Sequence, residues 1–286
     1  MKPPPFSYHD PETVSEVVAL LGSHENAKVL AGGQSLMPML NMRFVLPDHV
    51  IDLNRVRALS YIREVQGALE IGAMTRQRDL ELDTTVHARC PLLAEAILEV
   101  GHQQTRNRGT LGGSLCHLDP SAELVAAAMA LDAVVSVTGL KGAREIPFVQ
   151  FPLAYMTPAV EPDEILTGVR FPLWDAGHGY AFVEFARRHG DFAVCSAVVL
   201  LEKQSGGKIT RASVTVAGLA PAPTRVTEVE QALVGNPASD ALFRDAAERC
   251  RRLDAMGDVH APASYRKHLA AVLTRRALEK ASARCG

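Results

Sequence analysis

Two segments built around Gly-Gly pairs constrain the fold of this chain more than any other feature of its sequence. The first, LAGGQSLMPML, spans Leu30–Leu40 and follows a short apolar run, and the second, GTLGGSLCHLDP, spans Gly109–Pro120. Glycine allows a ligand to approach the backbone closely and tolerates positive φ angles, so consecutive amides in such a segment can line one phosphate-binding concavity. A serine hydroxyl adds a further donor in each segment. Two such segments match the two phosphates of a dinucleotide, whereas an isolated G-G-x-S string is usually a plain turn.

The two segments differ from the common nucleotide-binding motifs. Neither has the G-x-G-x-x-G of a Rossmann domain or the G-x-x-x-x-G-K-[ST] of a P-loop. A short helix that starts at Leu36 would direct its positive end toward the first segment. The sequence therefore favours a dinucleotide fold that holds a pyrophosphate between two loops from different subdomains.

The order of the predicted elements indicates an α+β fold. Up to Pro172, hydrophobic periodicity predicts strands at 28–31, 49–53, 68–73, 133–139 and 164–172, and helices at 14–22, 75–82 and 91–101, with a further helix opened by Asp119-Pro120. From Gly177 onward, three strands at 179–188, 192–202 and 211–219 precede helices at 228–234, 240–253 and 264–281. Strands followed by helices, without regular β-α-β alternation, argue against a doubly wound sheet.

Composition and charge exclude several classes of protein. With 47% hydrophobic and 22% charged residues, the 286-residue chain is neither disordered nor fibrous, and its formal net charge of −2 gives no electrostatic basis for binding nucleic acid or an anionic membrane. The N-terminal MKPPPFSYHDP lacks the apolar run of a secretory signal and no later run approaches a membrane span, so we expect a cytoplasmic protein. The five cysteines form no C-x-x-C pair, which argues against an iron–sulfur cluster held by this chain.

Three segments together resemble the signature segments of a known family. KVLAGGQSLMPMLNMRF at 28–44, TRNRGTLGGSLCHLDPSAEL at 105–124 and RRHGDFAV at 187–194 are similar to those of the FAD-binding medium subunit of molybdenum-containing hydroxylases. The resemblance is greatest to the aerobic carbon monoxide dehydrogenase group, is weaker to the xanthine dehydrogenase flavin domain, and covers nearly the whole chain. It implies a two-subdomain FAD-binding fold of the PCMH type, at 1–56 and 57–176, followed by a C-terminal α+β domain at 177–286 with a three-stranded antiparallel sheet and helices.

The resemblance also implies which residues bind FAD. Glu123 occupies the family's acidic position near the adenosine end, although a first-turn acid serves the helix dipole equally well. Leu166 lies where family members pass backbone along the flavin, and Phe192 lies near the isoalloxazine ring, where carbon monoxide dehydrogenases tend to carry tyrosine. The two Gly-Gly segments would hold the pyrophosphate with amides and hydroxyls. The residues implied in these segments are Lys28, Val29, Leu30, Ala31, Gly32, Gly33, Gln34, Ser35 and Leu36, and Thr110, Leu111, Gly112, Gly113 and Ser114.

By the same resemblance, the chain is one subunit of a three-part oxidoreductase. A small subunit with two [2Fe-2S] clusters would deliver electrons to its FAD, a large subunit would hold the molybdenum–pterin cofactor, and an external acceptor would receive the electrons. We expect a dimer of heterotrimers, with no catalytic acid or base and no metal ligand in this chain.

Two other functions remain open on the residues alone. One is a stand-alone FAD-dependent reductase or oxidase of the same fold, which would need its own substrate pocket and proton donor. The other is a scaffold that has lost its flavin, against which the intact glycines and serines of both segments argue. A local alternative is also open: Arg106, Asn107 and Arg108 either meet a phosphate or hold the loop before the second segment in place.

Overall fold

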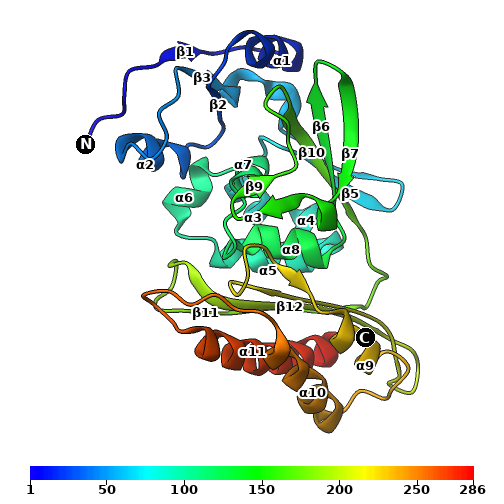
Figure 1. Cartoon of the computed structure of the whole chain (residues 1–286). Coiled ribbons are helices and arrows are strands. Elements are labelled where there is room, and N and C mark those ends of the chain that lie inside the picture. The colour runs from blue at the N-terminus through cyan, green and yellow to red at the C-terminus, as the bar shows by residue number, and fades with distance from the viewer.

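A parallel three-stranded sheet forms the N-terminal part of the computed structural model, which describes residues 1–286 (Figure 1). The strand order is β1 (Ser7–His9), β3 (His49–Asp52), β2 (Ala27–Leu30). Helix α1 (Val14–Ser23) starts at a capping box in which Thr13 and Glu16 satisfy each other's backbone N–H groups. The helix packs Val17, Val18 and Leu21 onto Ile51 of the central strand. This small core fixes the strand from which the first Gly-Gly segment leaves.

The second sheet is antiparallel and lies beside the first (Figure 1). Its central strand, β10, is the longest of the five, and most of its side chains are buried. In spatial order the strands are β4 (Ile62–Val65), β5 (Ala68–Gly72), β10 (Ile165–Pro172), β6 (Val134–Gly139) and β7 (Gly142–Pro147). A short hairpin of β8 (Pro152–Ala154) and β9 (Thr157–Pro158) precedes β10.

Short helices fill the space between this sheet and the C-terminal part. The most buried is α8 (Glu123–Ala130), every residue of which is buried. The others in this layer are α3 (Gln77–Leu82), α4 (Thr84–Arg89), α5 (Pro91–Glu99), α6 (Gln103–Arg108) and α7 (Leu111–His117). A further short helix, α2 (Leu36–Asn41), lies beside the N-terminal sheet. No helix combines the length and the apolar character needed to cross a membrane.

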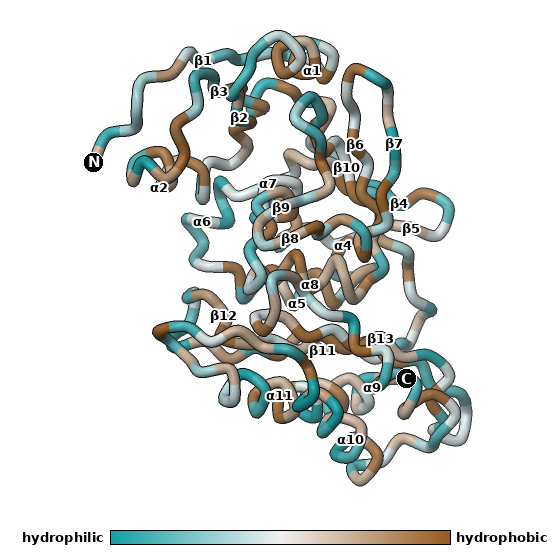
Figure 2. The backbone as a smooth tube through the Cα atoms, in the orientation of Figure 1, coloured by the Kyte–Doolittle hydropathy of each residue, from teal (hydrophilic) through white to brown (hydrophobic).

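The C-terminal part is an antiparallel sheet between two layers of helices. Helix α11 (Ala263–Arg284) covers one face, and α5 and α8 cover the other, where hydrophobic segments gather in Figure 2. In spatial order the strands are β11 (Gly179–Ala186), β12 (Ala193–Lys203), β13 (Ile209–Ala217) and β14 (Thr224–Arg225), and α9 (Thr227–Leu233) and α10 (Asp240–Ala247) follow. Because both faces are covered, the first nine residues of β12 are all buried.

The α+β fold and the three long C-terminal strands predicted from the sequence are confirmed, and the two-residue β14 adds a fourth strand to that sheet. Two local predictions are wrong. The second Gly-Gly segment is not a loop: its glycines lie in the first turn of α7, because Thr110 caps that helix. Asp119-Pro120 does not open α8 either. Asp119 instead accepts a hydrogen bond from the Ser121 N–H (2.8 Å) in a turn, and the helix starts at Glu123.

Candidate cofactor-binding cleft

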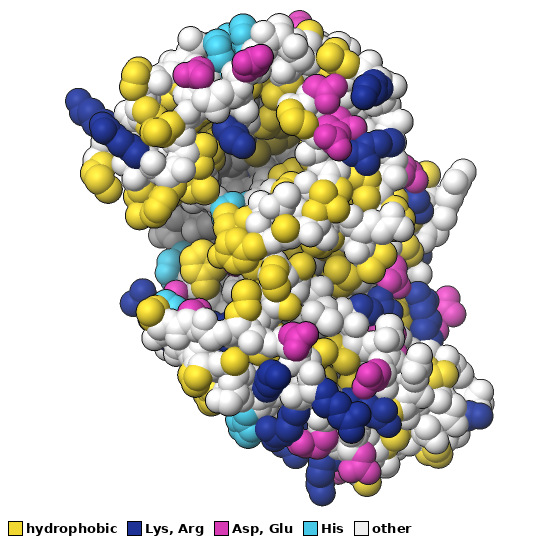
Figure 3. All heavy atoms as spheres, viewed as in Figure 1, with side chains coloured by type: hydrophobic (Ala, Val, Ile, Leu, Met, Phe, Trp, Pro, Cys, Tyr) yellow, Lys and Arg dark blue, Asp and Glu magenta, His cyan; other side chains and the backbone are white.

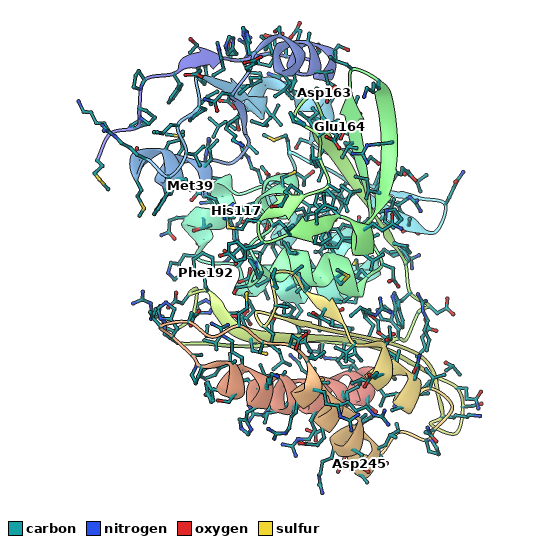
Figure 4. All side chains as sticks on the ribbon, viewed as in Figure 1. Met39, His117, Asp163, Glu164, Phe192 and Asp245 are labelled. Atoms are coloured by element: carbon teal, nitrogen blue, oxygen red, sulfur yellow. The ribbon has the colours of Figure 1, made fainter.

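A cleft of about 1170 Å³ separates the N-terminal part from the central helices and reaches the tip of the C-terminal sheet. Figure 3 shows it as a hollow below the N-terminal sheet, and Figure 4 shows Met39, His117 and Phe192 around it, from α2, α7 and the turn before β12. Pockets for drug-sized molecules measure about 300–1,000 Å³, so this one has room for a larger ligand.

The first Gly-Gly segment presents free backbone donors to this cleft. Residues Gly32 to Leu36 all line it, and the N–H groups of these residues donate to no acceptor in the protein. Gly33 has a φ of +75°, a backbone conformation that side chains with a Cβ rarely adopt. Consecutive unpaired amides beside a positive-φ glycine form the kind of concavity that binds an anion such as a phosphate.

The second Gly-Gly segment works differently, because the protein already uses its amides. Leu111 N–H donates to Thr75 O (3.1 Å), Gly112 N–H to Ala73 O (2.8 Å), and Gly113 N–H to the Thr110 hydroxyl (3.0 Å). Glycine is required at 112 for close packing, since a Cβ there would lie 2.7 Å from the Ala73 Cβ. This segment therefore offers side-chain groups and a close-packed wall, in contrast to the amide cradle expected from its sequence.

The two segments touch each other at their glycines. A Cβ on Gly32 would lie 2.2 Å from the Arg108 carbonyl oxygen, and a Cβ on Gly113 would lie 3.4 Å from the Ala31 Cβ. The Arg108 carbonyl thus occupies the space that a side chain on Gly32 would need, and a Cβ on Gly113 would be in van der Waals contact with the Ala31 side chain. Segments far apart in sequence form one continuous wall of the cleft.

Arg76 connects the two segments. Its guanidinium donates to the Arg108 carbonyl and to Asn54 Oδ1 (2.5 Å), and Asn54 in turn donates to Ala31 O (3.1 Å). Burial lowers the pKa of Arg76, and the nearby Arg108 cation lowers it further. The hydrogen bonds that offset this desolvation hold the ends of both Gly-Gly segments at a fixed separation.

Glu123 is a buried carboxyl at one end of the cleft. Its side chain is 9% exposed, and burial raises its pKa to about 7, with a further contribution from the Asp119 and Glu99 carboxylates. Burial likewise raises the pKa of Glu184 on β11 to about 8, and Glu123 and Glu99 add to that shift. Glu184 Oε2 is buried and has no hydrogen-bond partner. The Glu123 carboxylate therefore disfavours the ionised form of Glu184 at the junction between the central helices and the C-terminal sheet.

A Glu123→Gln variant of the ligand-free chain is expected to be more stable than wild type at pH 8. The folded-state pKa is raised from 4.5 to about 7, so wild type loses stability as the pH rises through that interval and recovers none above it. The expected gain for glutamine is up to about 3 kcal/mol at pH 8, and it disappears near pH 4. Urea unfolding at the two pH values measures it.

Glu228→Gln is the matched control, because Glu228 is also a first-turn helix acid but is exposed. It should lose a few tenths of a kcal/mol, about the size of a helix-dipole effect, at pH 8. If Glu123→Gln behaves like Glu228→Gln, Glu123 serves the helix dipole and the raised pKa is refuted.

The structure brings nearly all the sequence-predicted site residues to this one cleft. Only Leu30 and Leu111 do not line it, and Leu111 is fully buried in the core instead. Phe192 is 68% exposed at the cleft rim. The sequence leaves open whether Arg106 meets a phosphate or holds the segment before the second Gly-Gly pair in place. The structure favours the second role, because Arg106 is buried and pairs with Glu81 (2.7 Å). The residues that line the cleft are Lys28, Val29, Ala31, Gly32, Gly33, Gln34, Ser35, Leu36, Thr110, Gly112, Gly113, Ser114, Glu123, Leu166 and Phe192.

Sequence reasoning missed several lining residues. Gln77 lies against Gly109, and its Oε1 is buried without a hydrogen-bond partner. Cys116 and His117, on α7, also line the cleft, and burial raises the pKa of the Cys116 thiol to about 12. The i, i+3 spacing from Gly113 would have placed Cys116 near the cleft if the helix had been predicted. No sequence signal points to Gln77, because its neighbour Gly109 is reached only through the tertiary fold.

Comparisons with known proteins agree along the whole chain. A family model described as FAD binding domain in molybdopterin dehydrogenase matches residues 4–174, and one described as CO dehydrogenase flavoprotein C-terminal domain matches residues 180–281. The chain is 38% identical to the 6-hydroxypseudooxynicotine dehydrogenase complex subunit alpha of Paenarthrobacter nicotinovorans (98% of this chain, 96% of that one). It is 36% identical to the carbon monoxide dehydrogenase medium chain of Hydrogenophaga pseudoflava (100% of both). A solved structure of carbon monoxide dehydrogenase from Hydrogenophaga pseudoflava, lacking the Mo-pyranopterin moiety of the molybdenum cofactor, superimposes with a TM-score of 0.97 over 100% of both chains at 38% identity.

Proposed function

From the premise that this chain belongs to the family of FAD-binding medium subunits of molybdenum hydroxylases, we propose that it is the electron-transfer subunit of a heterotrimeric dehydrogenase. It receives electrons from [2Fe-2S] clusters of a small partner subunit at its FAD and passes them to an external acceptor. A large partner subunit holds the molybdenum–pterin cofactor and oxidises the substrate. The complex is a cytoplasmic dimer of heterotrimers.

The observation that carries this proposal is the row of unpaired N–H groups from Gly32 to Leu36 along the cleft. A pyrophosphate supplies the acceptors that these donors lack, and charge-assisted hydrogen bonds of this kind are stronger than neutral ones. Gln77 Oε1 is an acceptor that lacks a donor in the protein, and the hydroxyl and ring N–H groups of FAD, though not its pyrophosphate, are donors. The residues of the cleft therefore fit FAD, which supplies two-electron chemistry when bound.

Each part of the cleft has its own task in this proposal. Ala31 to Leu36 hold the pyrophosphate, with the side chains of Thr110 and Ser114 opposite. Glu123 accepts hydrogen bonds from the adenosine end. Because Glu123 is buried, the ligand and not bulk water is its partner. Leu166 and Phe192 orient the isoalloxazine, the first from the buried strand β10 and the second from the exposed rim. The chain binds and orients; it transfers no proton to a substrate.

Partner subunits follow from where this chain's cysteines lie. The five cysteines form no C-x-x-C pair, and the one group of side chains that could hold a metal ion contains no cysteine. Because an iron–sulfur cluster needs several cysteine thiolates close together, the electrons in this proposal arrive from clusters on another protein. We propose that the small subunit covers the rim around the exposed Phe192, where a cluster comes near the flavin.

The comparisons support placing the substrate chemistry elsewhere. One relative belongs to a complex named for 6-hydroxypseudooxynicotine and another to an enzyme named for carbon monoxide, yet both match this chain end to end at similar identity. Substrates so different do not share one pocket, so we assign substrate recognition to the large subunit. The division of this chain at 1–56, 57–176 and 177–286 remains a prediction, supported by the three larger sheets, one of which lies in each part.

Purification of the native complex through an affinity tag on this chain tests the proposal. We expect the chain to copurify with two other polypeptides, and the complex to contain flavin, iron and molybdenum. The visible spectrum should show flavin and iron–sulfur bands, both bleached by substrate. Recovery of the chain alone, with flavin and substrate-dependent turnover but no iron or molybdenum, would establish a stand-alone flavoenzyme instead. Recovery without flavin would establish a scaffold.

An Arg76→Gln variant is expected to bind FAD at least about tenfold more weakly while remaining folded. The substitution removes a charged donor that holds both Gly-Gly segments, and such a hydrogen bond is worth about 1.5–3 kcal/mol. Equilibrium titration of the flavin-free chain with FAD measures the change. Arg63→Gln is the control, because Arg63 is an exposed arginine paired with Glu70 (2.7 Å) outside the cleft and should leave affinity unchanged. Equal affinities in all three proteins would show that Arg76 does not position the segments.

A further inference from the structure

Three histidines meet on the face of the N-terminal sheet that α1 covers. Nε2 of His9 lies 3.0 Å from Nδ1 of His49, and the ring of His24 stacks on that of His49 with centroids 4.0 Å apart. One ring nitrogen of each of the three lies within 4.8 Å of those of the other two. Each side chain is half-buried, and Figure 3 shows histidines gathered over β1 and α1. We call His9, His24 and His49 the tri-histidine cluster.

The fold itself brings the tri-histidine cluster together. In the parallel pairing of β1 with β3, Ser7 lies opposite His49 and His9 opposite Ile51, so His9 and His49 point to the same face of the sheet. Ile51 on that face packs against α1, and His24 is the C-terminal cap of that helix. Two neighbouring strands and one helix end thus each contribute one imidazole, and all three backbones are anchored in the same small core.

The surroundings of the tri-histidine cluster favour a cation. The C-terminus of a helix carries partial negative charge, and the last turn of α1 contains no basic residue to offset it. None of the three imidazoles pairs with a carboxylate; the partners of each ring are the other two rings. Imidazole nitrogens without another hydrogen-bonding obligation are ligands that zinc, nickel and copper prefer, and three of them form a common zinc site whose fourth position water occupies.

The distances are close to those that coordination requires. Two nitrogens bound to one tetrahedral zinc ion at about 2.0–2.1 Å lie roughly 3.4 Å apart. On binding, the distance of 3.0 Å between the His9 and His49 nitrogens must increase slightly, and any longer nitrogen–nitrogen distance in the cluster, up to 4.8 Å, must decrease. The His24 and His49 rings are stacked at 14°, so binding an ion requires these half-buried side chains to rotate until their nitrogens point to one position.

We propose that His9, His24 and His49 form a binding site for one divalent transition-metal ion, with Zn²⁺ as the matching ion. The site lies at the far end of the chain's cofactor cleft, whose wall includes His24. A bound ion would join β1, the end of α1 and β3, and so fix the part of the N-terminal sheet that carries the first Gly-Gly segment. Its role is structural, and the site is separate from the residues assigned to FAD.

Calorimetric titration of the chelator-treated full chain with Zn²⁺ tests the proposal. We expect one zinc ion per chain, a higher melting temperature with zinc, and at least a tenfold loss of affinity in each of His9→Gln, His24→Gln and His49→Gln. His268→Gln is the control, because His268 is an exposed histidine on α11, far from the cluster, and its variant should bind zinc as wild type does. A zinc-free urea midpoint equal to that of the wild-type chain shows that each variant is folded.

Crystals of the wild-type chain soaked in Zn²⁺ provide a measurement that needs no variant. An anomalous peak at the zinc edge between the three imidazoles is expected. The proposal is overturned if the chain binds no zinc, if His24→Gln binds it with unchanged affinity and stoichiometry, or if the peak lies at other histidines.

Discussion

A Gly33→Val variant is expected to purify folded but without FAD. Gly33 has a φ of +75°, which a β-branched residue adopts only at a cost of about 1–3 kcal/mol. Its new Cβ would also lie 3.2 Å from Met37 Cγ, so the loop relaxes and the N–H groups from Gly32 to Leu36 lose their alignment. The loss of two or more charge-assisted hydrogen bonds corresponds to at least about a 100-fold weaker affinity for FAD. Flavin absorbance per chain measures it.

Gly67→Val separates the loss of FAD from simple backbone strain. Gly67 has a nearly identical φ of +77°, a Cβ added to it would meet no atom within 4 Å, and it does not line the cleft. The two variants should therefore lose similar stability in urea, whereas only Gly33→Val should lose flavin. Full flavin in purified Gly33→Val would show that the first Gly-Gly segment does not hold the cofactor.

A Gly113→Val variant is expected to lose both stability and FAD. A Cβ at this position would lie 2.7 Å from the Thr110 hydroxyl that caps α7, and 3.4 Å from the Ala31 Cβ in the first segment. The side chain therefore displaces the cap, at a cost of about 0.5–2 kcal/mol, and pushes the two Gly-Gly segments apart. We expect a lower urea midpoint and at least about tenfold weaker FAD binding, since a shift of this wall misplaces several contacts at once.

Thr110→Val isolates the capping part of that effect, because it removes the hydroxyl without adding atoms between the segments. It should be as unstable as Gly113→Val and should keep more of its flavin. Unchanged flavin content in Gly113→Val would contradict the contact between the two segments as the determinant of binding.

The family, the fold class and the cleft-lining segments were all predictable from the sequence. Glycine pairs report a local backbone requirement, and apolar residues spaced at two or 3.6 positions report which elements face the core, so both are visible without the fold. The three long C-terminal strands were predicted for this reason, since β12 is a continuous apolar run. Short elements such as β1 and α6 carry too few residues for a period to appear, and they were missed.

What each glycine does depended on partners distant in sequence. The strings AGGQS and LGGSL look equivalent, yet the amides of Gly112 and Gly113 are occupied, the first by the Ala73 carbonyl and the second by the Thr110 hydroxyl, whereas the amides from Gly32 to Leu36 are free. The Ala73 carbonyl lies far upstream in the sequence, directly after β5. The spacing of residues around Gly112 carries no information about such a distant partner. The expectation that amides of both segments line the concavity follows from local sequence, but in the folded chain the amides of Leu111, Gly112 and Gly113 already donate within the protein.

The sequence by itself determined the residue types that a dinucleotide site needs, and their order along the chain, because these follow from short-range backbone chemistry. Only the tertiary structure decided which amides stay unpaired, that Arg76 ties the two segments together, and that burial raises the pKa of Glu123 to about 7. The same holds for His9, His24 and His49, which parallel strand register and a helix end bring within 4.8 Å. Which amides are paired, which carboxyl is buried and which histidines lie together all depend on contacts between segments that are far apart in sequence. Such contacts exist only in the packed chain.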